Sequence, residues 1–285
     1  MVANMKLGLS IVSLLRYFTS NEVIDILAKA GIECVDFPFY SNDMVDPWPF
    51  AYENEALRRA EELRAYAEDR GVFFHQAHEP FTRGLTGDKL KCMRIAAALG
   101  CKYFVMHPVF HMSYEDFIAY PDKEEEALKE YFPELAALAG DLGLKGAVEN
   151  IFGYDSKRDT VYKIAMARPE VHKAVASCSP YLCACLDVGH ANIAGNDPAQ
   201  VARTLGSSLE VLHVHDSKDR TFEHTVPFLG NIDWQSFMNS LKEIGYKGVF
   251  SFEVDNFLDA FPTQLMPKAV RMVGEIGRYM KRMGR

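Results

Sequence analysis

The sequence has no apolar run that approaches the roughly 20 residues a helix needs to cross a bilayer. Its start, Met1–Leu9, does not combine a basic segment, an apolar segment and a small-residue cleavage site, so no secretory signal is predicted. No low-complexity tract or linker interrupts the 285 residues. We therefore expect a soluble, cytoplasmic protein with no membrane partner, folded as one domain.

Cysteine is scarce, and its placement argues against a disulfide scaffold. The chain has six cysteines, and Cys34, Cys101, Cys183 and Cys185 lie in strand-like apolar runs, where we expect buried, reduced thiols. The pair Cys183-Ala-Cys185 has no second cysteine pair to complete a zinc site. We interpret it as part of the packing.

Basic residues are outnumbered by acidic ones. With 31 Lys and Arg against 39 Asp and Glu, the formal net charge is −8. Non-specific affinity for nucleic acid comes mainly from basic side chains, so no nucleic-acid partner is expected. With 48% hydrophobic residues, the chain can bury a sizeable core, and its length suits a single barrel domain.

Short apolar runs alternate with longer segments of helical period, as in repeated βα units. The predicted strands are Lys6–Val12, Cys34–Phe39, Val72–Ala77, Tyr103–His107, Gly146–Asn150, Leu182–Val188, Val211–His215 and Gly248–Val254. The predicted helices are Asn21–Ala30, Glu53–Arg70, Gly87–Leu99, Glu124–Leu142, Pro169–Ala176, Pro198–Leu205, Trp234–Ile244 and Pro262–Met283.

Eight such units predict a (β/α)₈ barrel, that is, a TIM barrel. An open, doubly wound sheet also alternates strands and helices, but it usually has fewer strands and a glycine-rich turn after the first. Leu9-Ser10-Ile11 contains no such turn. In a barrel, the irregular stretches Tyr40–Ala51, Val109–Pro121, Phe152–Thr160 and Lys218–Ile232 follow strands and lie on the catalytic face.

Acidic and imidazole side chains crowd the ends of six predicted strands. They belong to the segments His75-Gln76-Ala77-His78, Met106-His107-Pro108, Val148-Glu149-Asn150, Leu186-Asp187-Val188-Gly189-His190, His213-Val214-His215-Asp216 and Phe252-Glu253-Val254. Strand ends meet at the mouth of a barrel, and clustered buried carboxylates repel one another unless a cation lies between them. Carboxylate and imidazole suit Mn²⁺, Mg²⁺, Co²⁺ or Zn²⁺, so one divalent metal ion is expected there.

These strand ends, together with Gly230-Asn231-Ile232-Asp233-Trp234, resemble the xylose-isomerase-like barrels over nearly the whole chain. That family includes sugar and sugar-phosphate isomerases and epimerases, hydroxypyruvate isomerase and the endonuclease IV class of DNA-repair enzymes. The resemblance implies that Glu149, Asp187, His213 and Glu253 bind the metal. His213 and Asp216 match the family spacing of a histidine followed three residues later by an acidic residue. Because His213 and His215 are two residues apart, a swap of their roles stays open.

For the sugar-processing members, the resemblance implies a sugar or sugar-phosphate substrate and a metal-stabilised enediolate. Glu149 and Glu253 would be the general base and general acid. Epimerisation and isomerisation are both open. The residues expected to contact substrate are His78, His107, His190, His215, Arg220 and His224.

Three features of the loops leave alternatives open. Trp48, Pro49 and Phe50 follow the second strand, either as a lid over the mouth or as a loop anchored by one aromatic residue. Arg220 is either a substrate contact or a solvated loop charge. Aromatic residues Phe110, Tyr114 and Phe117 are candidates for a homo-oligomer interface, which also stays open.

The rival function is that of an endonuclease IV-like enzyme acting on abasic sites in DNA. Those relatives bind three metals with additional ligands that resemble His78, His107, His190 and a loop Asp-x-His. His224 matches the last histidine, but Phe222 stands where the aspartate belongs, and Glu223 is displaced by one position. The loops also lack the interleaved basic and aromatic residues expected of a protein that grips a kinked duplex.

Overall fold

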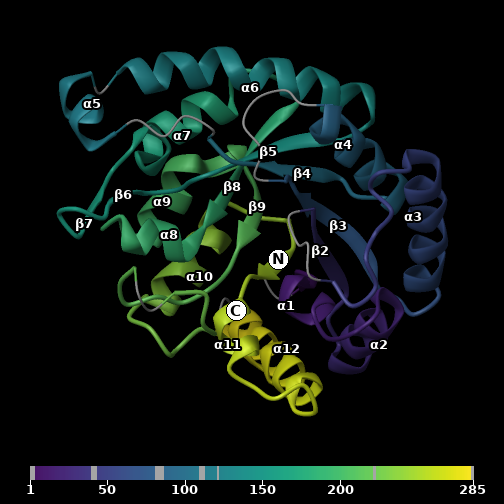
Figure 1. Ribbon diagram of the computed structural model, residues 1–285. Coiled ribbons are helices and arrows are strands. Elements are labelled where there is room, and N and C mark those ends of the chain that lie inside the picture. Colours follow the sequence, from purple (N-terminus) through teal and green to yellow (C-terminus); the bar gives the residue numbers. More distant parts are fainter. Residues whose placement is uncertain are drawn as a thin grey trace.

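Parallel strands form the core of the protein in a computed structural model that describes residues 4–39, 44–80, 87–108, 113–120, 122–220 and 223–283 (Figure 1). The strands of the main sheet are β1 (Leu7–Ser10), β2 (Cys34–Pro38), β3 (Phe73–His78), β4 (Tyr103–Met106), β5 (Lys145–Glu149), β8 (Leu182–Asp187), β9 (Leu209–His213) and β10 (Phe250–Phe252). Each is paired in parallel with its neighbours, and their order is β10-β1-β2-β3-β4-β5-β8-β9.

The two ends of this sheet meet just after β9. A parallel bridge joins Val214 to Phe252. The Val214 amide donates to the Ser251 carbonyl at 2.8 Å, and the Glu253 amide donates to the Val214 carbonyl at 3.1 Å. These bonds bring β9 against β10, so the predicted (β/α)₈ barrel is confirmed.

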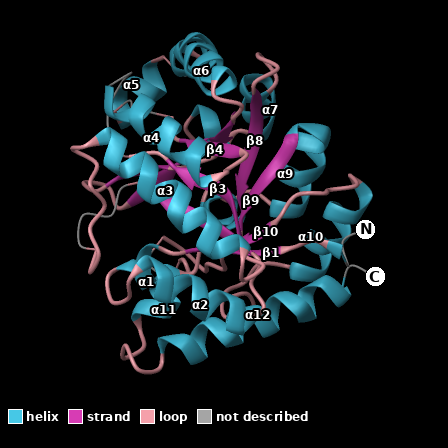
Figure 2. Cartoon of the chain, turned by 90° about the vertical axis from the view of Figure 1, so that its right-hand side faces the viewer, coloured by secondary structure: helices cyan, strands magenta, loops and turns pink. Residues whose placement is uncertain are grey.

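Helices surround the barrel on its outside (Figure 2). The longer ones are α2 (Ser20–Ala30), α3 (Glu53–Glu68), α4 (Gly87–Leu99), α6 (Lys123–Asp141), α7 (Pro169–Ala176), α9 (Pro198–Leu205), α10 (Trp234–Glu243) and α12 (Met266–Met283). Shorter turns are α1 (Val12–Leu15), α5 (Tyr114–Ala119), η2 (Ala165–Ala167), α8 (Val188–Ile193), η3 (Gly206–Ser208) and α11 (Asp255–Asp259). No helix among the described residues is both long and apolar enough to cross a membrane.

Local signals explain where these helices begin and end. Thr19 caps α2 in a capping box, in which its hydroxyl accepts from the Glu22 amide and Glu22 accepts from the Thr19 amide at 2.8 Å. Pro169 and Pro198 start α7 and α9, where the missing amide proton costs nothing. Gly31 ends α2 at a φ of 71°, in the left-handed region that favours glycine.

Two β-bulges shape the barrel wall. Val35 pairs with Phe74 and Asp36 with Gln76, which leaves His75 as an extra residue in β3. In the same way, the register of β9 against β8 shifts and leaves Glu210 without a partner residue. A bulge re-aims the side chain of its extra residue and increases the local twist.

Two stretches that were predicted to be irregular contain secondary structure. The described part of Val109–Pro121 includes helix α5. Within Phe152–Thr160 the chain forms most of an antiparallel hairpin of β6 (Gly153–Asp155) and β7 (Thr160–Tyr162). The rings of Tyr114 and Phe117 each lie 5.3 Å from the ring of Tyr162, so both are half-buried against this hairpin.

Phe110, the third candidate interface residue, lies outside the described residues, as does Phe222 of the rival motif.

The loop after β2 is anchored by its tryptophan. Trp48 is buried, its ring centroid lies 4.9 Å from that of Phe37, and the Arg59 guanidinium lies 4.8 Å over it. Phe50 stacks on Trp48 at 6.1 Å. The described part of this loop therefore packs as an extension of the core.

The six cysteines are free. Five are buried, as expected, whereas Cys178 is exposed. Burial raises the pKa of Cys34 to about 12, which keeps this thiol protonated and inert.

Candidate metal centre

The four predicted metal ligands lie at carboxyl ends of strands. Glu149, Asp187 and His213 are the last residues of β5, β8 and β9, and Glu253 directly follows β10. All four are buried. Because carboxyl ends of parallel strands meet at one rim of a barrel, the four side chains lie in the same mouth.

A first donor group consists of His78, Glu149, His213 and Glu253. One nitrogen or oxygen atom from each lies within 4.8 Å of the corresponding atoms of the others. His213 Nδ1 is 3.0 Å from Glu149 Oε1 and 3.4 Å from Glu253 Oε2, and His78 Nε2 is 3.5 Å from Glu149 Oε2. Three of the four predicted ligands are thus brought together, with His78 as a fourth donor.

The fourth predicted ligand, Asp187, belongs to a second donor group with His190, His215 and His224. Asp187 Oδ1 is 3.0 Å from His215 Nε2 and accepts from the His190 amide at 2.5 Å. The two groups adjoin, because His190 Nδ1 lies 3.6 Å from both Asp187 Oδ1 and Glu149 Oε1. The set of four ligands stays a prediction.

Unsatisfied carboxylate oxygens mark where a cation fits. Asp187 Oδ2 is buried and has no hydrogen-bond partner among the described residues. Glu253 Oε2 is also buried, and its 3.4 Å contact with His213 lacks hydrogen-bond geometry. Leaving a buried carboxylate oxygen unpaired is costly, whereas a divalent cation bound by carboxylate and imidazole removes that cost. The residues present therefore fit a divalent metal.

The electrostatics of the mouth hold Glu149 in the charged form. Burial alone would raise the pKa of Glu149, but His213 and His107 outweigh it and hold that pKa well below its usual range. Burial and repulsion from His213 lower the pKa of His78. The Asp36 carboxylate and a hydrogen bond to Glu149 outweigh these effects and raise the pKa to about 10. Protons on these imidazoles neutralise the carboxylates when no cation does so.

Asp36, in β2, is a candidate positioning residue that was not predicted from the sequence. It is fully buried and lies 3.1 Å from His78 Nδ1 and 3.2 Å from His213 Nε2. Gln76 Nε2 donates to Asp36 at 3.1 Å and lies 2.8 Å from His213 Nε2. Partners of this kind fix the orientation of a ligating imidazole. The available signal was an aspartate inside the apolar run Cys34–Phe39.

A buried chain of polar contacts positions His107, which follows β4. His107 Nε2 lies 2.9 Å from Glu149 Oε2, and its amide donates to Glu79 Oε1 at 2.7 Å. Glu79 Oε2 in turn is 2.5 Å from Lys89 Nζ, on α4. Glu79 and Lys89 were also missed, because a fully buried lysine cannot be distinguished from a surface lysine by its place in a helix.

Two neighbours of the second group have clear structural roles. A Cβ on Gly189 would lie 1.9 Å from His215 Cε1, so only glycine leaves room for that ring. Asp216 accepts from the Phe228 amide and from Trp234 Nε1, each at 2.8 Å. Asp216 therefore anchors the loop that enters α10.

His224, Glu223 and Arg220, in the loop after β9, have different surroundings. The His224 amide donates to His215 Nδ1 at 2.9 Å, and their rings stack with centroids 4.1 Å apart. Burial raises the pKa of Glu223, although His190 and His215 partly offset the effect. Arg220 stacks on the Tyr154 ring at 3.7 Å and donates to its hydroxyl at 3.0 Å, which holds the guanidinium against the β6–β7 hairpin.

Taken together, the fold and the mouth define a parallel β/α barrel with candidate metal ligands at the carboxyl ends of its strands. The chain belongs to the xylose isomerase-like TIM barrel family, whose model matches residues 24–275. The uncharacterized protein MJ1311 of Methanocaldococcus jannaschii is 31% identical over 145 residues, which is 50% of this chain and 48% of that protein. The match spans about half the length of that relative.

Two solved structures share the fold over almost their whole length. D-psicose 3-epimerase with D-tagatose from Clostridium cellulolyticum H10 has a TM-score of 0.69 at 16% identity, covering 97% of this chain and 99% of that chain. The IOLI protein with a binding zinc atom has a TM-score of 0.69 at 17% identity, covering 94% of this chain and 96% of that chain. At these identities the likeness establishes the fold.

Proposed function

We propose that the protein is a metal-dependent isomerase or epimerase acting on a sugar or sugar phosphate. The observation that carries the proposal is the approach of Glu149 and Glu253 to one imidazole nitrogen, at 3.0 and 3.4 Å, in a buried mouth. Two carboxylates so placed can serve as a proton donor and acceptor pair. A sugar epimerase among the proteins that share the fold supports the same reaction class.

Glu149, Asp187, His213 and Glu253 would hold one divalent ion, Mn²⁺, Mg²⁺, Co²⁺ or Zn²⁺. When bound, such an ion acts as a Lewis acid and stabilises negative charge that develops on substrate oxygens. A zinc atom in a protein of the same fold supports this expectation.

Glu149 and Glu253 divide the proton transfers. With its pKa held low by His213 and His107, Glu149 is ionised and suited to take the proton from the C–H next to the substrate carbonyl. Glu253 in its protonated form then returns a proton and becomes ionised, and exchange with solvent restores both glutamates. Return to the opposite face of the same carbon gives the epimer. Return to the neighbouring carbon, together with transfer of the hydroxyl proton to the former carbonyl oxygen, gives the isomer. The groups proposed to bind substrate hydroxyls or phosphate are His78, His107, His190, His215, Arg220 and His224.

The test is turnover in D₂O with Mn²⁺ and a panel of ketoses and ketose phosphates, followed by NMR. We expect product with deuterium at the carbon that exchanges its proton. Glu149→Gln and Glu253→Gln should each lower kcat by about 10²–10⁴ without loss of fold, because a proton-transfer group typically contributes that much.

Glu62→Gln, on the exposed face of α3, makes the same change in charge and should leave turnover unchanged. A fully active Glu253→Gln variant would show that Glu253 takes no part in the proton transfers.

A second candidate is the cleavage of DNA at abasic sites. The observation in its favour is the second donor group beside the first, which offers ligands for more than one cation. The same preparation is therefore incubated with a duplex that contains an abasic site. Strand cleavage without turnover of any sugar would overturn the proposal above in favour of this one.

A further inference from the structure

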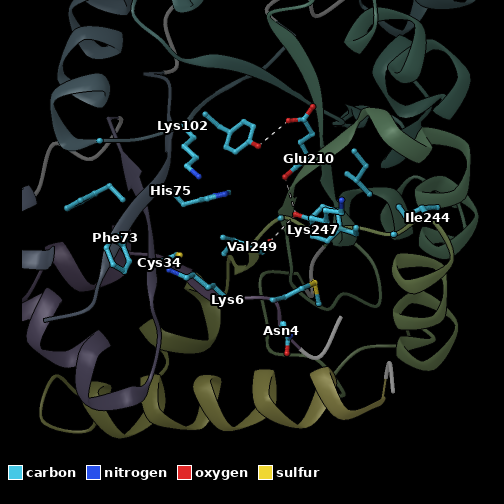
Figure 3. Close-up of a pocket in the computed structure, with 18 of the residues that line it drawn as sticks. Asn4, Lys6, Cys34, Phe73, His75, Lys102, Glu210, Ile244, Lys247 and Val249 are labelled. Carbon is cyan, nitrogen blue, oxygen red and sulfur yellow. Dashed lines mark hydrogen bonds between the residues drawn. The ribbon is translucent and has the colours of Figure 1, made fainter. Parts of the chain in front are cut away.

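The end of the barrel opposite the candidate metal centre contains a cavity of about 850 Å³ (Figure 3). It is lined at the amino ends of the strands, by Lys6 before β1, Phe73 and His75 of β3 and Lys102 before β4, among others. We call this cavity the basal pocket. Its volume falls within the range of about 300–1,000 Å³ that holds small-molecule ligands. None of the chemistry proposed above uses it.

Both β-bulges place a polar side chain in the basal pocket. His75, the extra residue of β3, and Glu210, the extra residue of β9, line opposite sides of it (Figure 3). His75 Nδ1 lies 3.0 Å from Gln76 Oε1, which fixes the ring. Glu210 accepts from the Tyr103 hydroxyl at 3.1 Å and pairs with Lys145 Nζ at 2.5 Å. The carboxylate of Glu210 is thus neutralised by Lys145, and Glu68, the other carboxylate among the lining residues, is paired with Arg64.

Three further lysines line the pocket without a neutralising partner. Lys6, Lys102 and Lys247 are exposed, and none has an ion pair with a described residue. Lys6 Nζ lies 4.2 Å over the Phe73 ring. Burial is the main reason that the pKa of His75 falls to about 4, and repulsion from Lys102 and Lys6 lowers it further. The positive charges of Lys6 and Lys102 therefore both reach the part of the pocket beside His75.

We propose that the basal pocket binds a phosphate-bearing small molecule, with Lys6 and Lys102 at the phosphate and the apolar wall at the rest of the ligand. Lysine ammonium groups serve as point charges for phosphate, whereas a carboxylate is best held by a free arginine fork. The arginine at this pocket, Arg64, is already paired with Glu68 at 2.8 Å. Met5, Leu209 and Val249 supply the apolar wall. The proposal does not depend on the function assigned to the mouth.

The test is calorimetric titration of the Mn²⁺-loaded protein with adenosine 5′-monophosphate, adenosine and inorganic phosphate. We compare the wild type with Lys6→Met/Lys102→Met and with Lys29→Met/Lys173→Met, which removes the same charge from exposed lysines elsewhere. We expect saturable binding of the monophosphate, at least tenfold weaker for adenosine and for the first double variant, and unchanged for the second.

Three results would overturn the proposal: no saturable binding of either phosphate probe, equal loss in both double variants, or full binding by Lys6→Met/Lys102→Met. The last result would place the probe at the mouth instead. Lys102→Met alone provides the same comparison if thermal unfolding shows that the double variant is poorly folded.

Discussion

Replacing Asp36 by asparagine tests whether this buried carboxylate orients the histidines of the first donor group. Asparagine keeps the shape of the side chain but removes the charge that faces His78 at 3.1 Å and His213 at 3.2 Å. An amide also cannot accept from both imidazoles through two carboxylate oxygens. Loss of such a partner typically weakens metal binding about 10- to 100-fold. That range corresponds to about 1.4–2.8 kcal/mol of binding free energy.

The assay is calorimetric titration of metal-free protein with Mn²⁺. Asp25→Asn is the matched control, because Asp25 makes a 2.6 Å bond to Arg70 on the outside of the barrel. We expect the Kd for Mn²⁺ to rise about 10- to 100-fold in Asp36→Asn and to stay unchanged in Asp25→Asn. If Asp36→Asn folds normally and binds Mn²⁺ as tightly as the wild type, Asp36 does not position the ligands, and the reasoning is wrong.

Two further substitutions test the packing around the mouth. Gly189→Ala places a methyl group 1.9 Å from His215 Cε1 and should cost about 1–3 kcal/mol in the free energy of unfolding, measured with urea; an unchanged midpoint would contradict the close fit. His172, whose Nε2 lies 2.7 Å from the Val148 carbonyl, has its pKa lowered by burial to about 4. As the pH is lowered, His172 takes up a proton in the unfolded state at a higher pH than in the folded state. The free energy of unfolding should therefore fall between a pH of about 6.5 and a pH of about 4, by up to roughly 3 kcal/mol. His172→Gln should flatten that part of the curve, and an equally steep curve would assign the loss to other groups.

The elements with strong local signals could be predicted to within a few residues. Helices α7 and α9 begin at Pro169 and Pro198, as predicted, because proline at the first helical position is a signal read directly from sequence. The strands were recognised by their apolar runs, although most are shorter than predicted, since burial extends beyond the hydrogen-bonded residues. The hairpin at Gly153–Tyr162 was missed because its strands are three residues long and half polar.

The polar network below the candidate ligands could not be predicted, for a physical reason. Whether an aspartate in a strand faces the barrel interior depends on register, and the bulge at His75 shifts the register of β3 against β2 at Asp36. No local pattern marks a bulge in a strand of this kind. The same holds for the pairing of Glu79 with Lys89, which depends on how α4 packs on the barrel.

Asp187 is predicted to be a metal ligand, and His190 and His215 are predicted to contact substrate. The second donor group is compatible with both predictions. Asp187 Oδ1 accepts from the His190 amide and lies 3.0 Å from His215 Nε2, whereas Oδ2 has no hydrogen-bond partner among the described residues. We therefore expect His190 and His215 to orient Asp187, the proposed ligand, and also to line the mouth as the proposed substrate contacts. The space required by His215 is available only because residue 189 is glycine. The Asp187-Val188-Gly189-His190 turn therefore places Asp187 Oδ1 against two histidines and leaves Oδ2 as the oxygen that we propose to bind the metal.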